Sequence, residues 1–189
     1  LNIHQQVFTS HISLTNLLFI IIIPVLTMRL IAEEKKLRTY DLLLTAPISA
    51  TDIAVGKYLA GLGTAAVLIL ISFLYPLGTA FFADFQMGPL LTSYLGLLLL
   101  TAAYVGVGLF SSSLTESSIL SVVMGVIFIF VLWFVSQGVE FSNNPIYREV
   151  MNHLSLGEHL MSFVKGSVKI SSVVFFLSCV GFFVFLAQR

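Results

Sequence analysis

The sequence predicts an all-α protein that crosses a membrane several times. Its composition is the first reason: of 189 residues, 58% are hydrophobic and 10% are charged, and the mean hydropathy is +1.02. A soluble domain carries about a quarter charged residues, and this chain has too few polar side chains to cover a water-facing surface. The second reason is the length of the apolar blocks, since a helix needs about 20 residues to cross a bilayer. The third is that charged residues are almost absent from the centres of these blocks.

Five membrane spans are expected, and all of them are expected to be helices. An open strand in lipid would leave backbone groups without hydrogen-bond partners, whereas a helix satisfies them internally. The alternation typical of a membrane β-strand is also absent from the apolar runs. Pro24 and Pro76 lie inside spans and are predicted to kink the helices there. The spans are predicted at 14–31, 53–82, 90–112, 117–137 and 171–187.

Small residues recur at helical spacing in two of these spans. Ser121 and Gly125 lie four residues apart, as do Ala102 and Gly106. This spacing lets helix backbones approach closely. Packing of helices within one subunit is favoured over a contact between two copies.

The basic residues predict the orientation of the chain. Five of the nine lysines and arginines lie between residues 29 and 57, and Arg189 follows the last span. The positive-inside rule therefore places the segment 32–51 and the C-terminus in the cytoplasm, and the N-terminus and the segment 138–169 outside. An external N-terminus without a signal segment is unusual, so we expect a further span to precede Leu1.

The segment 32–57 carries most of the functional information. Residues 32–44 are predicted to form one charged, amphipathic helix, in which Glu34 and Arg38 lie four residues apart on one face. Pro47 ends this helix, and Ser49 to Asp52 form a capping box before the next span. One interpretation is an interfacial helix whose charges only fix the topology. The other is a docking helix that presents Tyr40 and the leucines at 42–44 to a cytoplasmic partner.

Three motifs in this segment resemble the signature of the ABC-2 type permeases: EEKK at 33–36, TYDLLLTAPIS at 39–49 and GKYLA at 56–60. The resemblance is closest to the gliding-motility-associated and nitrous-oxide-accessory branches, and SLGEH at 155–159 is similar to the segment before the last span of that family. Two positions depart from the pattern. Arg38 stands where the family usually has glycine, and we expect it to keep the helix continuous. Asp41 stands where the family usually has glutamate.

The resemblance implies an ABC-2 type helical bundle with five of six spans present, and the function of an exporter permease. It places the chain in the prokaryotic cytoplasmic membrane. It also implies two partners: a cytoplasmic ABC ATPase subunit, which binds ATP and Mg²⁺, and a second copy of the chain or a related permease. No cofactor is implied for this chain itself. The expected ATPase-docking residues are Glu33, Glu34, Arg38, Thr39, Tyr40, Asp41, Leu42, Leu43 and Leu44.

The segment 138–169 is predicted to form two short helices on the outer side. Asn144 and Pro145 are typical of a helix start, Ser155 and Glu158 of a capping box, and Gly166 of a helix end. In the resembled family such helices dip into the outer leaflet and close the exit; the alternative is an inert surface hairpin. The expected outer-gate residues are Ile146, Val150, Leu154, Glu158 and Phe163.

Enzymatic chemistry is not expected in this chain. It has no Gly-x-x-x-x-Gly-Lys-Ser/Thr loop, and no set of nucleophile, base and acid converges on one place. His153 and His159 lie six residues apart without an evident third ligand, so no metal site is expected. The net charge of +0 gives no indication of a nucleic-acid partner. Two other classes stay open: a secondary transporter or channel, which would need intramembrane charges or an inverted repeat, and a non-transporting anchor or assembly subunit.

Overall fold

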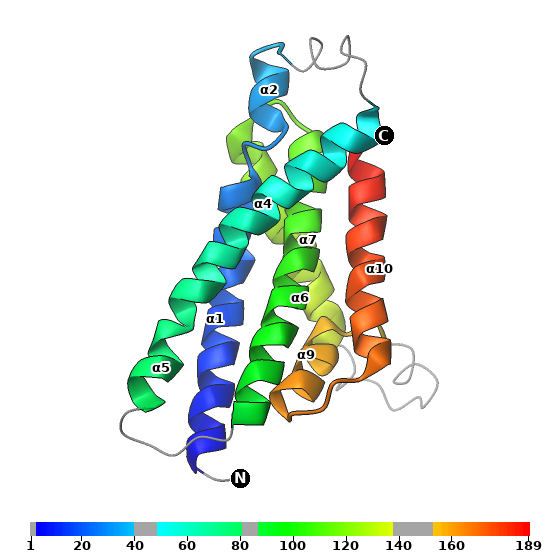
Figure 1. Cartoon of the computed structure of the whole chain (residues 1–189). Helices are drawn as coiled ribbons and strands as arrows, with labels where there is room; N and C mark the ends of the chain where they lie inside the picture. Colours follow the sequence, from blue (N-terminus) through cyan, green and yellow to red (C-terminus); the bar gives the residue numbers. More distant parts are fainter. Residues whose placement is uncertain (1–2, 40–48, 81–86, 138–152) are drawn as a thin grey trace.

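The computed structural model describes residues 3–39, 49–80, 87–137 and 153–189, and the regular elements in these ranges are all helices (Figure 1). Four stretches are long and apolar enough to cross a membrane: Thr9–Lys36, Ala50–Gly78, Met87–Ser113 and Ile170–Ala187; the apolar helix Ser118–Phe134 is shorter. The predicted all-α membrane fold is therefore confirmed. The helices are α1 (Ile3–Thr27), α2 (Ala32–Lys36), α4 (Ala50–Ser72), α5 (Leu74–Ala80), α6 (Met87–Ser113), α7 (Ser118–Gln137), α9 (Leu156–Val164) and α10 (Ile170–Ala187).

The first helix differs from the predicted span 14–31 at both ends. α1 begins at Ile3, because the polar residues before position 14 continue the helix. It ends at Thr27, whose hydroxyl donates back to the carbonyl of Ile23 at 2.9 Å. The chain then turns before α2, so the charged segment starts as a separate short helix.

The start of α4 is fixed by the capping box that the sequence predicts. The hydroxyl of Ser49 accepts the backbone N–H of Asp52 at 3.1 Å, and the carboxylate of Asp52 accepts the backbone N–H of Ser49 at 3.0 Å. Two donors at the helix start are thereby satisfied. The helix consequently begins at Ala50, three residues before the predicted boundary.

Pro76 divides the second predicted span into α4 and α5. Proline has no backbone N–H, so Pro76 cannot bond the carbonyl of Ser72, four residues earlier. The hydroxyl of Tyr94 on α6 donates to that carbonyl at 3.0 Å instead. The break predicted near Pro76 is present, and a neighbouring helix satisfies the carbonyl that the proline leaves without its usual donor.

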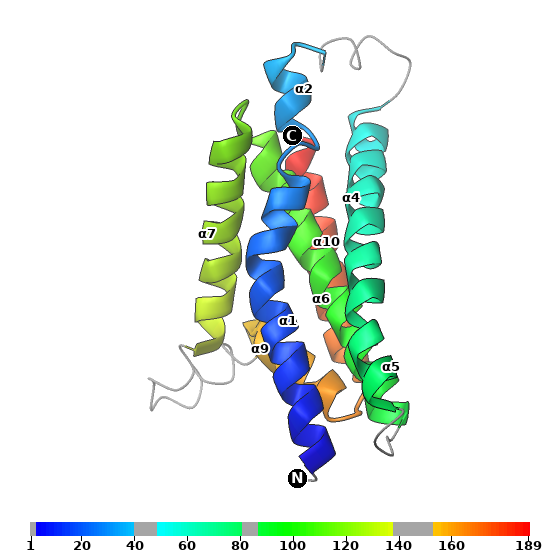
Figure 2. The same cartoon turned by 90° about the vertical axis from the view of Figure 1, so that its left-hand side faces the viewer.

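α6 lies at the centre of the bundle and contacts α1, α4, α7, α9 and α10 (Figures 1 and 2). Residues 101–109 are all buried. A helix that is covered on every side needs apolar or small residues on every face, and this segment supplies them. α6 is therefore the element through which the other helices are held together.

Glycines allow the closest contacts between helices of this chain. A Cβ placed at Gly108 on α6 would lie 2.0 Å from the hydroxyl oxygen of Thr27 on α1. A Cβ at Gly125 on α7 would lie 3.1 Å from Pro24 on α1. At Gly106 the neighbour is Phe183 on α10, at 3.4 Å. These glycines pack helices within one subunit, which is the interpretation that the sequence favours.

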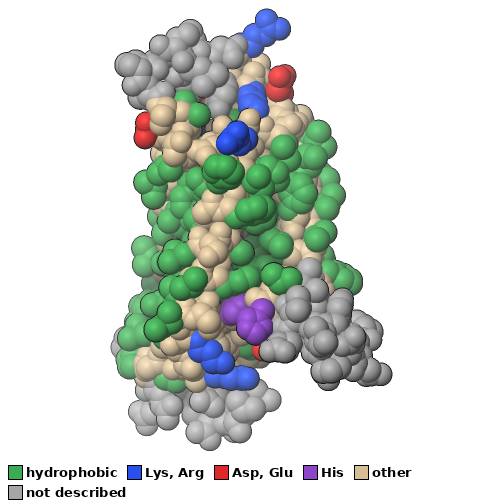
Figure 3. Space-filling view, turned by 90° about the vertical axis from the view of Figure 1, so that its right-hand side faces the viewer, with side chains coloured by type: hydrophobic (Ala, Val, Ile, Leu, Met, Phe, Trp, Pro, Cys, Tyr) green, Lys and Arg blue, Asp and Glu red, His purple; other side chains and the backbone are tan. Residues whose placement is uncertain are grey.

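The two ends of the bundle are polar, and the surface between them is apolar. The α2 end holds α2 and the C-terminus, and the α9 end holds α9 and the N-terminus (Figure 1). On the face shown in Figure 3, hydrophobic side chains form a belt between charged groups at both ends. Exposed side chains on α10, such as Leu177 and Phe182, belong to the apolar surface. The positive-inside rule assigns the α2 end to the cytoplasm, which stays a prediction.

Candidate functional site

α2 is attached to the end of α6 through one serine. The residue before α2 is Ile31, which offers no side-chain cap. The hydroxyl of Ser112 instead accepts the backbone N–H groups of Ile31 and Ala32, at 3.1 and 3.0 Å. The same hydroxyl donates to the carbonyl of Met28 at 3.0 Å. Ser112 is completely buried, so one side chain satisfies three backbone groups of the turn between α1 and α2.

Two lysines extend this attachment to a second helix. The ammonium group of Lys35 donates to the carbonyl of Ser113 at the end of α6. Lys57, in the third turn of α4, forms an ion pair with Glu34, and the two side chains are only 23% and 27% exposed. Partial burial protects this pair from screening by salt. α2 is thus bonded to α6 and to α4, and we define this set of contacts as the α2 attachment.

Arg38 ends α2, which corrects the expectation of a continuous helix over residues 32–44. Arg38 has a φ of 55°, its N–H donates to the carbonyl of Lys35 at 3.1 Å, and the N–H of Thr39 donates to the carbonyl of Glu34 at 3.0 Å. These two bonds form a Schellman motif, whose left-handed position is usually a glycine because a Cβ is strained there. The helix therefore breaks at the position where the resembled family has glycine, although the residue here is arginine.

The structure describes only part of the predicted docking set. Glu34 pairs with Lys57, not with Arg38 as the helical spacing predicted. Beside these residues lies Leu37, with 65% of its surface exposed. Four predicted docking residues, Glu33, Glu34, Arg38 and Thr39, lie on α2 or directly after it, and Tyr40, Asp41, Leu42, Leu43 and Leu44 lie outside the described residues.

At the opposite end, α9 begins and ends with the signals that the sequence contains. The hydroxyl of Ser155 accepts the backbone N–H of Glu158 at 3.1 Å, which is one half of the predicted capping box. Gly166 has a φ of 79°, and a second Schellman motif, with the same pair of backbone bonds as at Arg38, ends the helix. Gly166 is therefore the helix-end glycine that was predicted.

α9 is fixed to α6 by Phe163. A Cβ placed at Gly96 on α6 would lie 2.6 Å from the Cβ of Phe163, so only glycine permits this approach. The hydroxyl of Thr92 donates to the carbonyl of Phe163 at 2.9 Å. Of the predicted outer-gate residues, Phe163 is completely buried, whereas Leu154 and Glu158 are exposed. The other two, Ile146 and Val150, lie outside the described residues.

His159 is held by hydrogen bonds on both ring nitrogens. Its Nδ1 lies 2.9 Å from the hydroxyl of Ser172, and its Nε2 lies 3.0 Å from the carbonyl of His153. The ring also stacks on Phe175, with centroids 4.3 Å apart. Over the described ranges, no three His, Cys, Asp or Glu side chains gather in a way that could hold a metal ion. The role of His159 in this geometry is to join α9 to α10.

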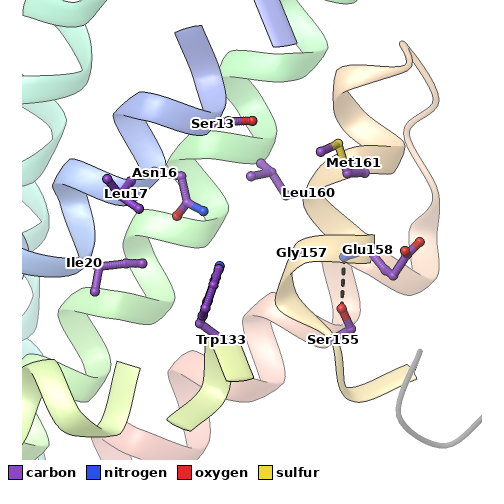
Figure 4. A pocket seen from close by; sticks show the side chains of 10 residues that line it. All are labelled: Ser13, Asn16, Leu17, Ile20, Trp133, Ser155, Gly157, Glu158, Leu160 and Met161. Carbon is purple, nitrogen blue, oxygen red and sulfur yellow. Dashed lines mark hydrogen bonds between the residues drawn. The ribbon is translucent and has the colours of Figure 1, made fainter. Parts of the chain in front are cut away.

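A pocket of about 450 Å³ opens between α1, α7 and α9 at the α9 end (Figure 4). Asn16 from α1 and Trp133 from α7 extend into this space, with α9 opposite them. Apolar and polar residues both contribute to the rest of the lining. The pocket is a second candidate site, separate from the α2 attachment. Its lining residues are Ser13, Asn16, Leu17, Ile20, Trp133, Ser155, Gly157, Glu158, Leu160 and Met161.

The contacts of Ser112 and Ser113 and the partner of Lys57 are not predictable from motifs in the sequence. The available signal was weak: three consecutive serines, 111–113, stand at the end of an apolar span. Such serines often bond within their own helix, as Ser111 does with the carbonyl of Gly108 at 2.9 Å. Which of the three serines reaches another helix depends on the packing of the whole bundle.

Comparison with known proteins gives one match. The model of a family described as ABC-2 family transporter protein matches residues 5–156, which includes the whole segment between α1 and α4. The match extends from α1 to the first residue of α9. No curated protein and no solved structure matches the chain.

Proposed function

The chain belongs to the ABC-2 family of transporter proteins, and from this premise we propose that residues 33–44 dock onto a separate cytoplasmic ATPase subunit. Family membership makes the chain a multi-pass permease component of an ABC-type transporter. ATP and Mg²⁺ are bound on the ATPase subunit in this proposal. Its hydrolysis of ATP moves the docking segment, and the movement passes to the membrane helices.

The α2 attachment is the observation that supports this coupling. An interfacial helix that only fixed the topology would need no specific bonds to the helices behind it. α2 instead bonds Ser112 and Ser113 at the end of α6, and its Glu34 pairs with Lys57 on α4. The residues directly after α2 are exposed. A partner that binds these exposed residues would therefore act on α6 and α4 through short polar contacts.

The proposal also covers the direction of transport and the assembly. The α2 end faces the cytoplasm of a prokaryotic cell, because five of the nine basic residues lie between positions 29 and 57. Substrate leaves at the α9 end, where α9 covers the end of α6. The transporter contains two permease subunits, either two copies of this chain or this chain with a related one.

Co-purification with the ATPase tests the docking step. The full-length permease, with an affinity tag, is co-expressed with each Walker A-containing ABC ATPase subunit of the same genome. We expect Leu37→Lys, or Asp41→Lys with Leu43→Lys, to reduce the recovered ATPase by about tenfold or more, because a few central residues carry most of the energy of an interface. Basal expression and membrane insertion are measured for each variant.

Val168→Lys is the matched control, since Val168 is also an exposed aliphatic residue but lies in the link between α9 and α10. Recovery of the ATPase with this variant should equal that of the wild type. Unchanged recovery with both docking variants would refute docking through residues 33–44. Transport that continues in reconstituted vesicles without ATP would instead favour a secondary transporter.

A further inference from the structure

The pocket between α1, α7 and α9 contains a hydrogen-bond donor whose orientation is fixed. The hydroxyl of Tyr104, a buried residue of α6, donates to the Oδ1 of Asn16 at 3.0 Å. The amide oxygen of Asn16 therefore faces Tyr104, and its NH₂ group faces the pocket (Figure 4). That NH₂ group has no hydrogen-bond partner among the residues that the structure describes. The Asn16 nitrogen is not among the buried atoms that lack a partner, so it is accessible to a ligand that supplies an acceptor.

Trp133 supplies a second donor from the facing helix. Its side chain is half-buried, and its ring is held against Phe130 and Phe134, with centroids 5.9 and 6.0 Å away. In the part of the chain that the structure describes, its indole N–H makes no hydrogen bond, and the nitrogen is not fully buried. Figure 4 shows the nitrogen-bearing edge of the ring turned toward the space below Asn16. Two N–H donors from two helices thus converge on one pocket.

The aliphatic part of the remaining walls favours a ligand with an apolar body. Leu17, Ile20 and Leu160 line the pocket with aliphatic side chains. The exposed carboxylate of Glu158 points away from Asn16 and Trp133, so it does not face these two donors (Figure 4). The volume of about 450 Å³ lies within the range of pockets that hold drug-sized ligands.

We propose that this pocket binds an amphiphile whose polar end supplies a hydrogen-bond acceptor. A carbonyl or ether oxygen of its polar end accepts hydrogen bonds from Asn16 and Trp133, and its apolar part packs against Leu17, Ile20 and Leu160. The identification of this amphiphile as transported cargo rests on the proposed permease function. Binding itself needs no ATPase subunit and can be measured without it.

The chain has a single tryptophan, so its fluorescence reports on this pocket alone. The full-length permease in nanodiscs is titrated with a long-chain alkyl amide that carries bromine on its chain, because bromine quenches tryptophan only near contact. We expect saturable quenching. Asn16→Leu and Asn16→Asp should each raise the Kd about five- to tenfold, since both remove the donor. Asn16→Asp keeps the acceptor for Tyr104, so it separates loss of the donor from loss of packing.

Three controls make the result specific. Leu14→Ala changes an exposed residue on the same helix that does not line the pocket, and should leave the Kd unchanged. Trp133→Phe should abolish the signal. The brominated alkane of equal chain length, which has no hydrogen-bond acceptor, should bind at least about fivefold more weakly than the amide. Equal or tighter binding of the alkane would overturn the proposed class of ligand.

A second experiment distinguishes a bilayer lipid from a free amphiphile. It places brominated phosphatidylcholine in the nanodisc and measures the same tryptophan quenching. If quenching by the brominated lipid saturates, and is weaker in Asn16→Asp, the occupant is a bilayer lipid. If only the added amide gives saturable quenching, the occupant is a free amphiphile. For both probes, quenching could instead rise linearly and be equal in wild type and Asn16→Asp. That result would overturn the proposal that the pocket binds a ligand. If the permease recovers the ATPase but does not bind the amphiphile, the pocket proposal is rejected and the docking proposal is not. If the amphiphile binds saturably but no ATPase is recovered, the docking proposal is rejected and the pocket proposal is not.

Discussion

Lys57 on α4 and Glu34 on α2 form an ion pair that joins residues 23 positions apart in the sequence. The second carboxylate oxygen of Glu34 is buried and has no hydrogen-bond partner among the described residues. The carboxylate of Glu34 is largely removed from water, which costs free energy. The ammonium group of Lys57 is therefore the main group that offsets this desolvation cost.

Removal of Lys57 alone should be more harmful than removal of the whole pair. We expect Lys57→Met to lower the free energy of unfolding by roughly 1–3 kcal/mol, because Glu34 keeps its charge without a partner. Glu34→Gln combined with Lys57→Met should recover part of this loss. The thermal unfolding midpoint in detergent, measured as a double-mutant cycle, tests the prediction. Strictly additive effects of the two single changes would contradict it.

Ser112→Ala should loosen the attachment of α2 to α6. The substitution leaves two backbone N–H groups at the start of α2 without an acceptor, and we expect a loss of about 1–3 kcal/mol. Ser178→Ala is the matched control, because the exposed Ser178 bonds only the carbonyl of Val174 in its own helix at 2.7 Å. Hydrogen exchange of residues 31–37 should rise in the first variant and stay at the wild-type level in the second.

Arg38→Gly should stabilise the protein, whereas Gly166→Ala should destabilise it. Both positions occupy the left-handed site of a Schellman motif, with φ of 55° and 79°. A Cβ in this conformation costs about 1 kcal/mol, so each change should shift stability by about that amount in opposite directions. A Cβ at Gly166 meets only ordinary contacts with Pro89, at 3.5 Å or more, so backbone strain dominates there. Thermal unfolding midpoints that moved in the same direction for both variants would count against this account.

Gly96→Ala should separate α9 from α6. The new methyl group would lie 2.6 Å from the Cβ of Phe163, and overpacking of this kind costs typically about 1–3 kcal/mol. Gly63→Ala is the control, since nothing lies within 4 Å of a Cβ there, and alanine favours a helix by about 1 kcal/mol. Protease sensitivity of α9 should increase in Gly96→Ala only, and equal sensitivity in both variants would argue against a steric contact at Phe163.

The sequence was sufficient for the class of fold and for features that depend on neighbouring residues. Apolar block length predicted helices in all five span regions, and the Ser49 capping box and the helix end at Gly166 depend on residues within a few positions of each other. The break at Arg38 was missed because side-chain type alone favours continuation of a helix through arginine. The backbone bonds to Lys35 and Glu34 outweigh that preference.

Contacts between distant segments could not be read from the sequence. Asn16 and Tyr104 lie 88 positions apart, and Ser112 lies 81 positions from Ile31. Neither pair has a spacing that indicates contact, because each depends on how α1 packs against α6. Lys57 was identified as a topology signal and as part of the resemblance, but its pairing with Glu34 depends on how α4 lies beside α2.

α6 is one unbroken helix of 27 residues, which makes it about 40 Å long. Pro89 lies in its first turn, where proline is tolerated, so no internal proline interrupts the helix. Its end near Ser112 bonds α2, and its other end packs against Phe163 on α9. A rotation of about 5° about the first end would displace the second by about 3.5 Å over this length. If residues 33–44 dock as proposed, a small angular change there would move the end of α6 that holds Phe163, and with it α9, which is one wall of the pocket at the opposite end of the bundle.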